Sequence, residues 1–492
     1  MDNPTIEAAG TRAIAGDASS MTPSAWRSAA IPAALTIVAT IAAFGTVYAI
    51  SKPFQAGPNA AILSAVLALT QGRRRGSSDH SPWMKLATFP VVAVGVSAIG
   101  WLLHHAFAMG ACVFIVAMSF SIWSRQFGET MRRVGSVAAL PLVAVLVAPA
   151  PPHAPGGPLI NVFLVIVAGV AAYTWLIVIA EISKRVSGTA STPAKTATSS
   201  AESARKKATL SPHTRMAIQM GVALTAAFVI GRFVFAHHWS WIVLTAFIVC
   251  SGSITRGDAI YKGFLRLAGA TAGTLAAALV QYIHAPHGAG AAVLIFAVLF
   301  VGLWLREINY AWWAACITLV IAVLQSTGAG TDASLLHLRL LEILIGALCG
   351  AGATWFVLPI PTESLVRRRM ADALLALDEF ASTEHASPEE RQQRLQIFQE
   401  HITKLDRMTS MVNFHRHVML QHRNDNHPAA WIHLMRRSAH RVDVFQGSRK
   451  DLVRAIRYTR KTLGQRELPL CDPLQHLNAL LESGDERKAS SV

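Results

Sequence analysis

The sequence has few charged residues and many apolar ones. Only 15% of its 492 residues are charged and 52% are apolar, with a mean hydropathy of +0.40. Soluble chains carry about 25% charged residues, and at this length they would form about three domains with polar surfaces. The composition therefore excludes a soluble multidomain enzyme and indicates a protein whose solvent is lipid.

Sequence signatures of several chemistries are missing as well. The chain has no GxxxxGK(S/T) phosphate loop, no GxGxxG after a strand, no HExxH and no GxSxG. We therefore expect no enzymatic activity, no cofactor, no metal site and no ATP-driven transport by this chain alone. The cysteines show no metal-ligand spacing and most lie in apolar runs, which excludes a secreted disulfide scaffold; they are Cys112, Cys250, Cys316, Cys349 and Cys471.

The net charge of +16 is unevenly distributed along the chain. Residues 362–492 carry 21 Lys and Arg against 17 Asp and Glu, and residues 1–361 carry 23 against 11. In the apolar part the basic residues gather in short loops, which is typical of the positive-inside rule. This pattern predicts the lipid bilayer as a partner and argues against nucleic acid.

Apolar runs long enough to cross a hydrocarbon layer of about 30 Å recur along the first 360 residues. Together with two shorter runs, 57–71 and 239–253, they predict an all-α polytopic fold of twelve spans, since isolated strands in lipid would leave amides unpaired. The ten longer runs are 29–50, 86–104, 106–123, 134–150, 159–182, 216–236, 267–284, 289–305, 310–326 and 335–358.

Alternate loops differ strongly in basic content, which predicts the orientation. The opposite loops carry only Lys52, whereas 18 Lys and Arg lie in 72–85, 124–133, 183–215, 254–266 and 306–309. The basic loops are therefore expected in the cytosol, as are both termini, because the number of spans is even. Residues 1–25 lack the features of a cleavable signal and are expected to form a cytosolic tail.

The apolar part divides into two similar halves. A segment rich in Ser, Thr, Ala and Lys, 187–213, predicts a cytosolic linker between a first six-span repeat, 26–186, and a second, 214–361. Internal similarity indicates a duplication, and six spans per half make the repeats parallel. At one offset of 181 residues, Arg75-Gly76 coincides with Arg256-Gly257, Lys85-Leu86-Ala87 with Arg266-Leu267-Ala268, and Trp123-x-Arg125 with Trp304-x-Arg306.

Residues 362–492 are polar and predict a cytosolic helical domain. Ser387-Pro388-x-Glu390 forms a capping box with proline at the first helical position. The charged residues and histidines of this domain show no catalytic spacing. We expect four helices, at 363–385, 388–421, 429–464 with a weak point at Gly447, and 473–483.

Ionisable side chains within the spans are costly and are candidate site residues. Arg232 lies near the outer end of its span, where a snorkelling role is the alternative. Arg339 and Glu342 share one face of the last span, about one and two turns below the outer surface, and form either a structural ion pair or a functional one. In the functional interpretation, Arg339 binds an anion and Glu342 exchanges a proton.

The two short runs indicate where a substrate could bind, because interrupted helices in matching positions leave backbone groups free for a ligand. Asn59 in the first run, and Trp239, Trp241 and Thr245 in the second, would line such a site. Glycine pairs predict close helix packing elsewhere; they are Gly269-x-x-x-Gly273 and Gly346-x-x-x-Gly350.

The second half of the chain resembles a known family. The segment RLAGATAGT at 266–274, Asn309-Tyr310 with Thr318, and Arg339 followed by Gly346 and by Leu358-Pro359 resemble the fusaric acid resistance family of membrane proteins. This family includes aromatic carboxylic acid exporters of bacterial inner membranes. The resemblance covers 214–360 and extends to 29–182 through the repeat. Glu342 and Ala270 depart from the family pattern, and whether Glu342 serves coupling or only pairs with Arg339 stays open.

The resemblance implies efflux of small, often aromatic, carboxylic acids, driven by the proton gradient across a bacterial inner membrane. Arg266 on the inner side, with Arg232 and Arg339 on the outer side, suits such an organic anion. Two alternatives remain, a passive organic-anion channel and a non-transporting membrane protein that recruits a partner through its cytosolic domain. A homodimer and a periplasmic adaptor are compatible with each of these.

Overall fold

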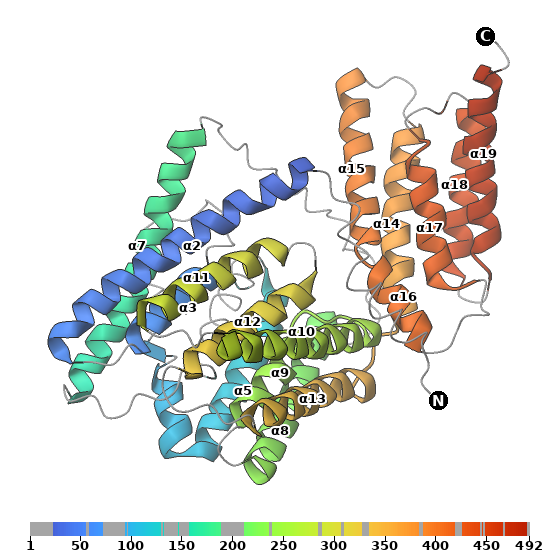
Figure 1. The fold of residues 1–492 in the computed structure, drawn as a ribbon. Helices are drawn as coiled ribbons and strands as arrows, with labels where there is room; N and C mark the ends of the chain where they lie inside the picture. The colour runs from blue at the N-terminus through green and yellow to red at the C-terminus, as the bar shows by residue number, and fades with distance from the viewer. Residues whose placement is uncertain are drawn as a thin grey trace. The chain divides into compact units, whose positions relative to one another are not determined.

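The structure is a computed structural model, and all secondary structure in its described residues is helical (Figure 1). This agrees with the all-α prediction. Most of the predicted tail 1–25, of the span 134–150 and of the linker 187–213, and about half of the span 86–104, lie outside the described residues. These are 23–55, 59–71, 94–95, 97–128, 131, 146, 157–187, 211–235, 239–283, 288–306, 309–326, 334–382, 387–418, 426–442, 445, 448–465 and 468–489.

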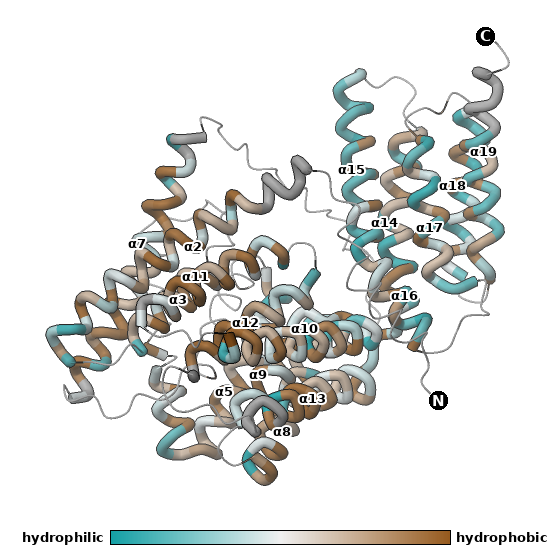
Figure 2. Tube along the Cα trace, in the orientation of Figure 1, coloured by the Kyte–Doolittle hydropathy of each residue, from teal (hydrophilic) through white to brown (hydrophobic). Residues whose placement is uncertain are grey.

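The described chain forms two units. The apolar unit contains the described residues up to Ser253 and those from Lys262 to Leu358, and the polar unit contains Ile254–Tyr261 and the residues from Pro359 onward. Hydrophobic residues dominate the helices of the apolar unit, whereas hydrophilic residues cover much of the helices of the polar unit (Figure 2).

Six described helices of the apolar unit are long and apolar enough to cross a membrane. They are α2 (Pro23–Ser51), α5 (Phe107–Trp123), α7 (Gly157–Ser187), α8 (Pro212–Val234), α10 (Arg256–Ile283) and α13 (Ser334–Phe356). Four shorter apolar helices accompany them, α3 (Asn59–Gln71), α9 (Trp239–Cys250), α11 (Gly288–Leu305) and α12 (Tyr310–Ser326). The chain is therefore a multi-pass membrane protein.

The helices of the apolar unit pack in two groups of the same kind. In the first half α2, α3 and α7 contact one another, and in the second half α8, α9 and α13 do the same. Each group combines the first long helix, the following short helix and the last long helix of its half. Small residues allow this packing, and Ala43, Ala61 and Ala168 are fully buried within the first group.

The fourth predicted span of each half packs on the other half. Helix α5 contacts α8, where the Phe114 and Phe228 ring centroids are 5.7 Å apart. Helix α11 contacts α2, where Phe44 meets Phe296 edge to face at 5.8 Å. Helix α5 thus packs on α8 of the second half, whereas α11 packs on α12 of its own half and also reaches α2 of the first half. An aromatic pair lies at each contact between the halves.

The polar unit is a helical bundle with one apolar core. Its largest fully buried side chain is Trp431, which packs in a cluster with Met370, Phe398 and Ile456. A hydrogen bond attaches Ile254–Tyr261 to this bundle, because the Gly257 N–H donates to Thr362 Oγ1 at 3.3 Å. The helices are α14 (Thr362–Ser382), α15 (Pro388–Asp406), α16 (Thr409–Val418), α17 (Pro428–Ala439), α18 (Arg449–Gly464) and α19 (Cys471–Ala489).

The prediction of four helices in this unit is wrong, because two of the expected helices are divided. The expected helix 388–421 ends at Asp406 and a new one starts at Thr409, and the expected helix 429–464 is divided between α17 and α18. Helix α18 has its own N-cap, because Ser448 Oγ accepts a hydrogen bond from the Asp451 N–H at 3.4 Å. The predicted cap at Ser387 is confirmed, with the Glu390 N–H donating at 3.2 Å.

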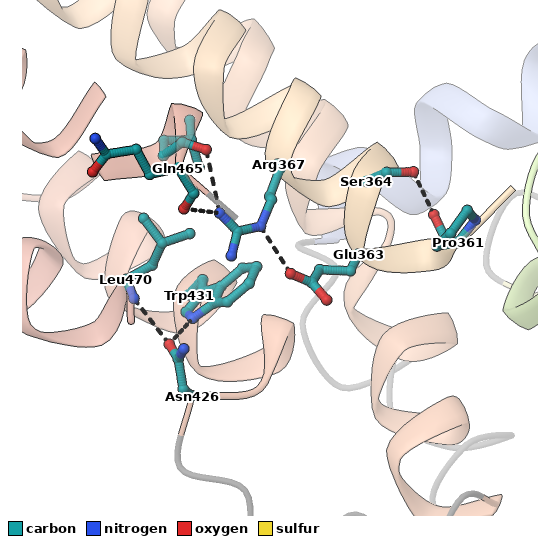
Figure 3. A network of polar contacts seen from close by, with 9 residues as sticks. Pro361, Glu363, Ser364, Arg367, Asn426, Trp431, Gln465 and Leu470 are labelled. Carbon is teal, nitrogen blue, oxygen red and sulfur yellow. Dashed lines mark hydrogen bonds and ion pairs between the residues drawn. The ribbon is translucent and has the colours of Figure 1, made fainter. Parts of the chain in front are cut away.

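A polar network joins α14 to the ends of α17 and α18 (Figure 3). Arg367 Nε donates to Glu363 at 2.8 Å, and its Nη1 donates to the Leu463 carbonyl at 3.2 Å. Its guanidinium lies over the Trp431 ring, 4.9 Å from the centroid. Arg367 therefore fixes the C-terminal end of α18 against α14.

Candidate functional site

Helices α9 and α13 meet at a seam that glycines make unusually close. A Cβ atom at Gly346 would lie 2.5 Å from the Ile242 carbonyl oxygen and 2.7 Å from Thr245 Cβ. One turn further along, a Cβ at Gly350 would lie 2.9 Å from Val249 Cβ. The predicted close packing of this glycine pair is thus present, and it brings the expected site residues of both helices together.

Arg339 and Trp241 contact each other across this seam. The guanidinium carbon of Arg339 lies 5.0 Å from the Trp241 ring centroid, and Trp241 is buried. A stacked guanidinium is attracted by the ring face and keeps its N–H edge available for an anion. Arg339 itself is half-buried.

Glu342 follows Arg339 on the same face of α13 and is fully buried. Neither of its carboxylate oxygens has a hydrogen-bond partner in the described chain. The expected Arg339–Glu342 pairing is therefore not a hydrogen-bonded ion pair in this structure, because the guanidinium lies over Trp241 instead. A buried carboxylate without partners is strongly disfavoured as an anion, so this position favours the protonated acid.

Thr245 provides a third unpartnered oxygen at the same seam. It is fully buried, and its hydroxyl has no hydrogen-bond partner among the described residues. Threonines in helices usually donate to the carbonyl four residues earlier. Six others in the apolar unit do so, namely Thr36, Thr40, Thr46, Thr225, Thr271 and Thr318. The Thr245 hydroxyl is thus available for a ligand or a proton carrier.

Arg266 lies in a different seam, between α10 and α12. Its side chain is 1% exposed and forms a hydrogen bond with the Tyr310 side chain, while Nε and Nη2 have no partner in the described chain. The seam is tight because Gly269 and Gly273 face α12, where a Cβ at Gly273 would lie 2.9 Å from Thr318 Cβ. A buried guanidinium with donors to spare is costly unless an anion joins it.

The remaining expected site residues do not join these two seams. Arg232 is exposed, and its guanidinium lies 5.6 Å from the Phe107 ring centroid. Trp239 packs in the same aromatic group, 5.2 Å from Phe107 and 5.5 Å from Phe228. Asn59 is the first residue of α3 and lies in the first half. Within the described ranges, no group of three His, Cys, Asp or Glu side chains could hold a metal ion.

Sequence reasoning selected Arg266 from the resemblance but did not foresee its burial, since it was assigned to a loop. Tyr310 was seen only as part of a motif, and its hydrogen bond with Arg266 gives it a role at the α10–α12 seam. The sequence signal that could have indicated this role is the position of Tyr310 as the first residue of an apolar helix.

Comparison with known protein families points to the part of the chain that contains these two seams. Residues 220–353 match the family described as fusaric acid resistance protein-like. The matched segment contains Arg266 and the four candidate site residues at the α9–α13 seam, which are Trp241, Thr245, Arg339 and Glu342. No curated protein matches the chain. The similarity and the apolar helices together indicate a membrane protein that resembles transporters.

Proposed function

We propose that this protein exports small organic anions, in particular aromatic carboxylates, across a bacterial inner membrane. The observation that carries this proposal is Arg266, a fully buried guanidinium with two unpartnered nitrogens inside the segment that matches the family model. Carboxylates are natural partners of such a group, because arginine binds them through paired N–H donors. Arg266 would receive the anion from the cytosolic side.

Arg339 and Glu342 would serve the outer half of the route. The Arg339 guanidinium, stacked on Trp241, offers an anion both a positive charge and a flat aromatic face. Glu342 would take up a proton from the outer side when the anion leaves, since its buried carboxylate has no other partner. Export of the anion would thus be coupled to proton entry.

The proposal includes the architecture of twelve spans in two parallel repeats, with both termini and residues 362–492 in the cytosol. Two observations support the duplication. The three-helix groups of the two halves contain corresponding helices. Helices α5 and α11 begin at Phe107 and Gly288, which are 181 residues apart, the offset at which the sequence motifs coincide. Basic loops on one side support the orientation.

Transport into inside-out membrane vesicles with an acidic lumen tests the proposal. Radiolabelled benzoate would accumulate in the lumen, whereas benzylamine, a cation of similar shape, would not depend on the protein. Passive diffusion concentrates a weak acid in the more alkaline compartment, so benzoate in the acidic lumen requires coupling to the proton gradient. Vesicles without the protein and vesicles containing Arg266→Met are the controls.

Each result distinguishes a class of function. Accumulation that disappears when a protonophore removes the gradient supports coupled export. Faster equilibration without accumulation would instead indicate an organic-anion channel. Benzoate movement equal to that of empty vesicles, with the protein present in normal amount, would refute transport of this class.

A further inference from the structure

The polar unit contains a cavity of about 470 Å³ between α14 and α18. Its wall is strongly basic, with five cationic side chains among eight lining residues. The lining residues are Arg367, Arg368, Ala371, Arg457, Arg460, Lys461, Leu463 and Gly464. A cavity of this size is within the range that holds small molecules or headgroups.

The carboxylates beside this cavity balance only part of its charge. Asp378 pairs with two guanidinium groups at once, at 3.5 Å from Arg457 and 3.1 Å from Arg460. Glu363 pairs with Arg367. Asp378 and Glu363 are thus shared among Arg367, Arg457 and Arg460, so this part of the cavity carries a local excess of positive charge that favours an anion.

The positions of these cations are not explained by the helix dipole alone. Basic residues in the last turn stabilise the C-terminal end of a helix, which accounts for Lys461. Arg457 lies two turns before the end of α18 at Gly464, where this effect has faded. Arg457 and Lys461 are four residues apart and exposed, so both present charge on the same face of α18.

We propose that this cavity binds a multiply charged phosphate group. Arg367 forms the rigid wall, because its donors already hold α14 to the end of α18 and its plane lies on Trp431 (Figure 3). Arg457, Arg460 and Lys461 supply charge-assisted hydrogen bonds from the opposite wall. The phosphates belong either to a soluble molecule or to the headgroup of an anionic lipid, and both present the same chemistry to the cavity. This site is independent of the export proposed above.

Titration of the full-length protein with pyrophosphate tests the soluble source. Isothermal calorimetry in a neutral detergent measures binding to the wild type, to Arg457→Gln/Lys461→Gln and to Lys450→Gln/Arg454→Gln. The second pair is the matched control, because it removes two charges from the same helix outside the cavity. We expect the first pair to weaken binding at least ~10-fold and the control to change it by less than about 2-fold. Citrate, an anion of similar charge without phosphate, tests the chemistry of the ligand.

Hydrogen exchange of α18 in nanodiscs tests the lipid source. In the wild type, phosphatidylglycerol nanodiscs would protect Arg449–Gly464 more than phosphatidylcholine nanodiscs do, and Arg457→Gln/Lys461→Gln would remove the difference. A response to pyrophosphate alone identifies a soluble ligand, and a response to phosphatidylglycerol alone identifies a lipid. The proposal is overturned if neither is bound, if citrate binds as well as pyrophosphate, or if both double variants lose binding equally.

Discussion

The Arg339 guanidinium lies over the Trp241 ring, with its Cζ atom 5.0 Å from the ring centroid. This contact joins α13 to α9 and places a cation beside an aromatic face. Glu342 and Thr245, which follow on the same two helices, are fully buried with unpartnered oxygens. The arrangement combines the groups that an aromatic carboxylate and a proton would each require.

Replacing Arg339 by alanine should lower benzoate export at least ~10-fold, because a charge-assisted contact with the carboxylate is lost. Arg339→Lys should retain part of the activity, since lysine keeps the positive charge but lacks the planar guanidinium with its paired N–H donors. Lys52→Ala is the matched control, because Lys52 also stacks on an aromatic ring, Tyr48, at 5.3 Å. Vesicle transport at equal protein abundance is the measurement. Full activity of Arg339→Ala would refute the assigned role.

Arg266→Met should separate stability from transport. Removing a buried charge with unpartnered donors should leave the thermal unfolding temperature in detergent unchanged or raise it. Transport should fall to the level of empty vesicles, because the inner anion contact is lost. If the variant unfolds at a clearly lower temperature, Arg266 is a structural residue held through Tyr310.

Glu342→Gln should uncouple transport from the proton gradient. The amide has the shape of the carboxylic acid but cannot release a proton. Benzoate should still equilibrate across the vesicle membrane, while accumulation in the acidic lumen should disappear. Glu181→Gln, which changes an exposed carboxylate paired with Arg185 on α7, should transport as the wild type does. If benzoate accumulates normally with Glu342→Gln, a different residue couples transport to the proton gradient.

Gly346→Ala should destabilise the α9–α13 seam by about 1–3 kcal/mol, because the added Cβ meets the Ile242 backbone, which cannot move away cheaply. Gly352→Ala on the same helix is the control, since a Cβ there meets nothing within 4 Å. Thermal unfolding of the two purified variants is the comparison. Equal stabilities would contradict the close approach of the two helices.

The polar unit should lose stability as the pH falls below neutral. Burial lowers the pKa of His427 from 6.5 to about 4, with Arg416 and His415 adding repulsion. His427 is therefore neutral in the folded state at neutral pH. Its contribution to the stability of the folded unit is complete above about pH 6.5 and is lost as the pH falls toward 4. At ~1.4 kcal/mol for each pKa unit, the loss reaches about 3 kcal/mol.

Hydrogen exchange of α17, corrected for intrinsic rates, measures this loss. His427 Nδ1 accepts a hydrogen bond from the Ala429 N–H at 3.2 Å, which protonation would break. His427→Asn keeps an N-cap without a titrating group, so its protection should depend less on pH than that of the wild type. If the pH dependence of protection is unchanged in His427→Asn, the effect would be assigned to His415, because burial also lowers the pKa of His415.

Sequence patterns predicted the helical class and the ends of most apolar helices, because a helix in lipid must satisfy its backbone internally and is visible as a long apolar run. The cap at Ser387 was predictable for a similar reason, since its signal is local. The break between α15 and α16 was not predicted, and the break between α17 and α18 was indicated only by the weak point at Gly447.

The candidate site was predictable only in its residue types. Arg339, Glu342 and Trp241 stand out because polar or aromatic groups in apolar runs are rare. That Glu342 has no hydrogen bond to Arg339, and that Thr245 does not bond to its own helix, depends on how α9 and α13 approach each other. Arg266 was assigned to a loop. Gly269 and Gly273 predicted close helix packing, but local sequence did not indicate that α12 would be the partner and that Arg266 would be buried.

The contacts that α5 and α11 make with the opposite half limit how this protein can change shape. Pulling the two halves apart as rigid blocks would break the Phe114–Phe228 and Phe44–Phe296 contacts simultaneously. Opening toward either face of the bilayer would therefore proceed through sliding within the glycine-lined seams.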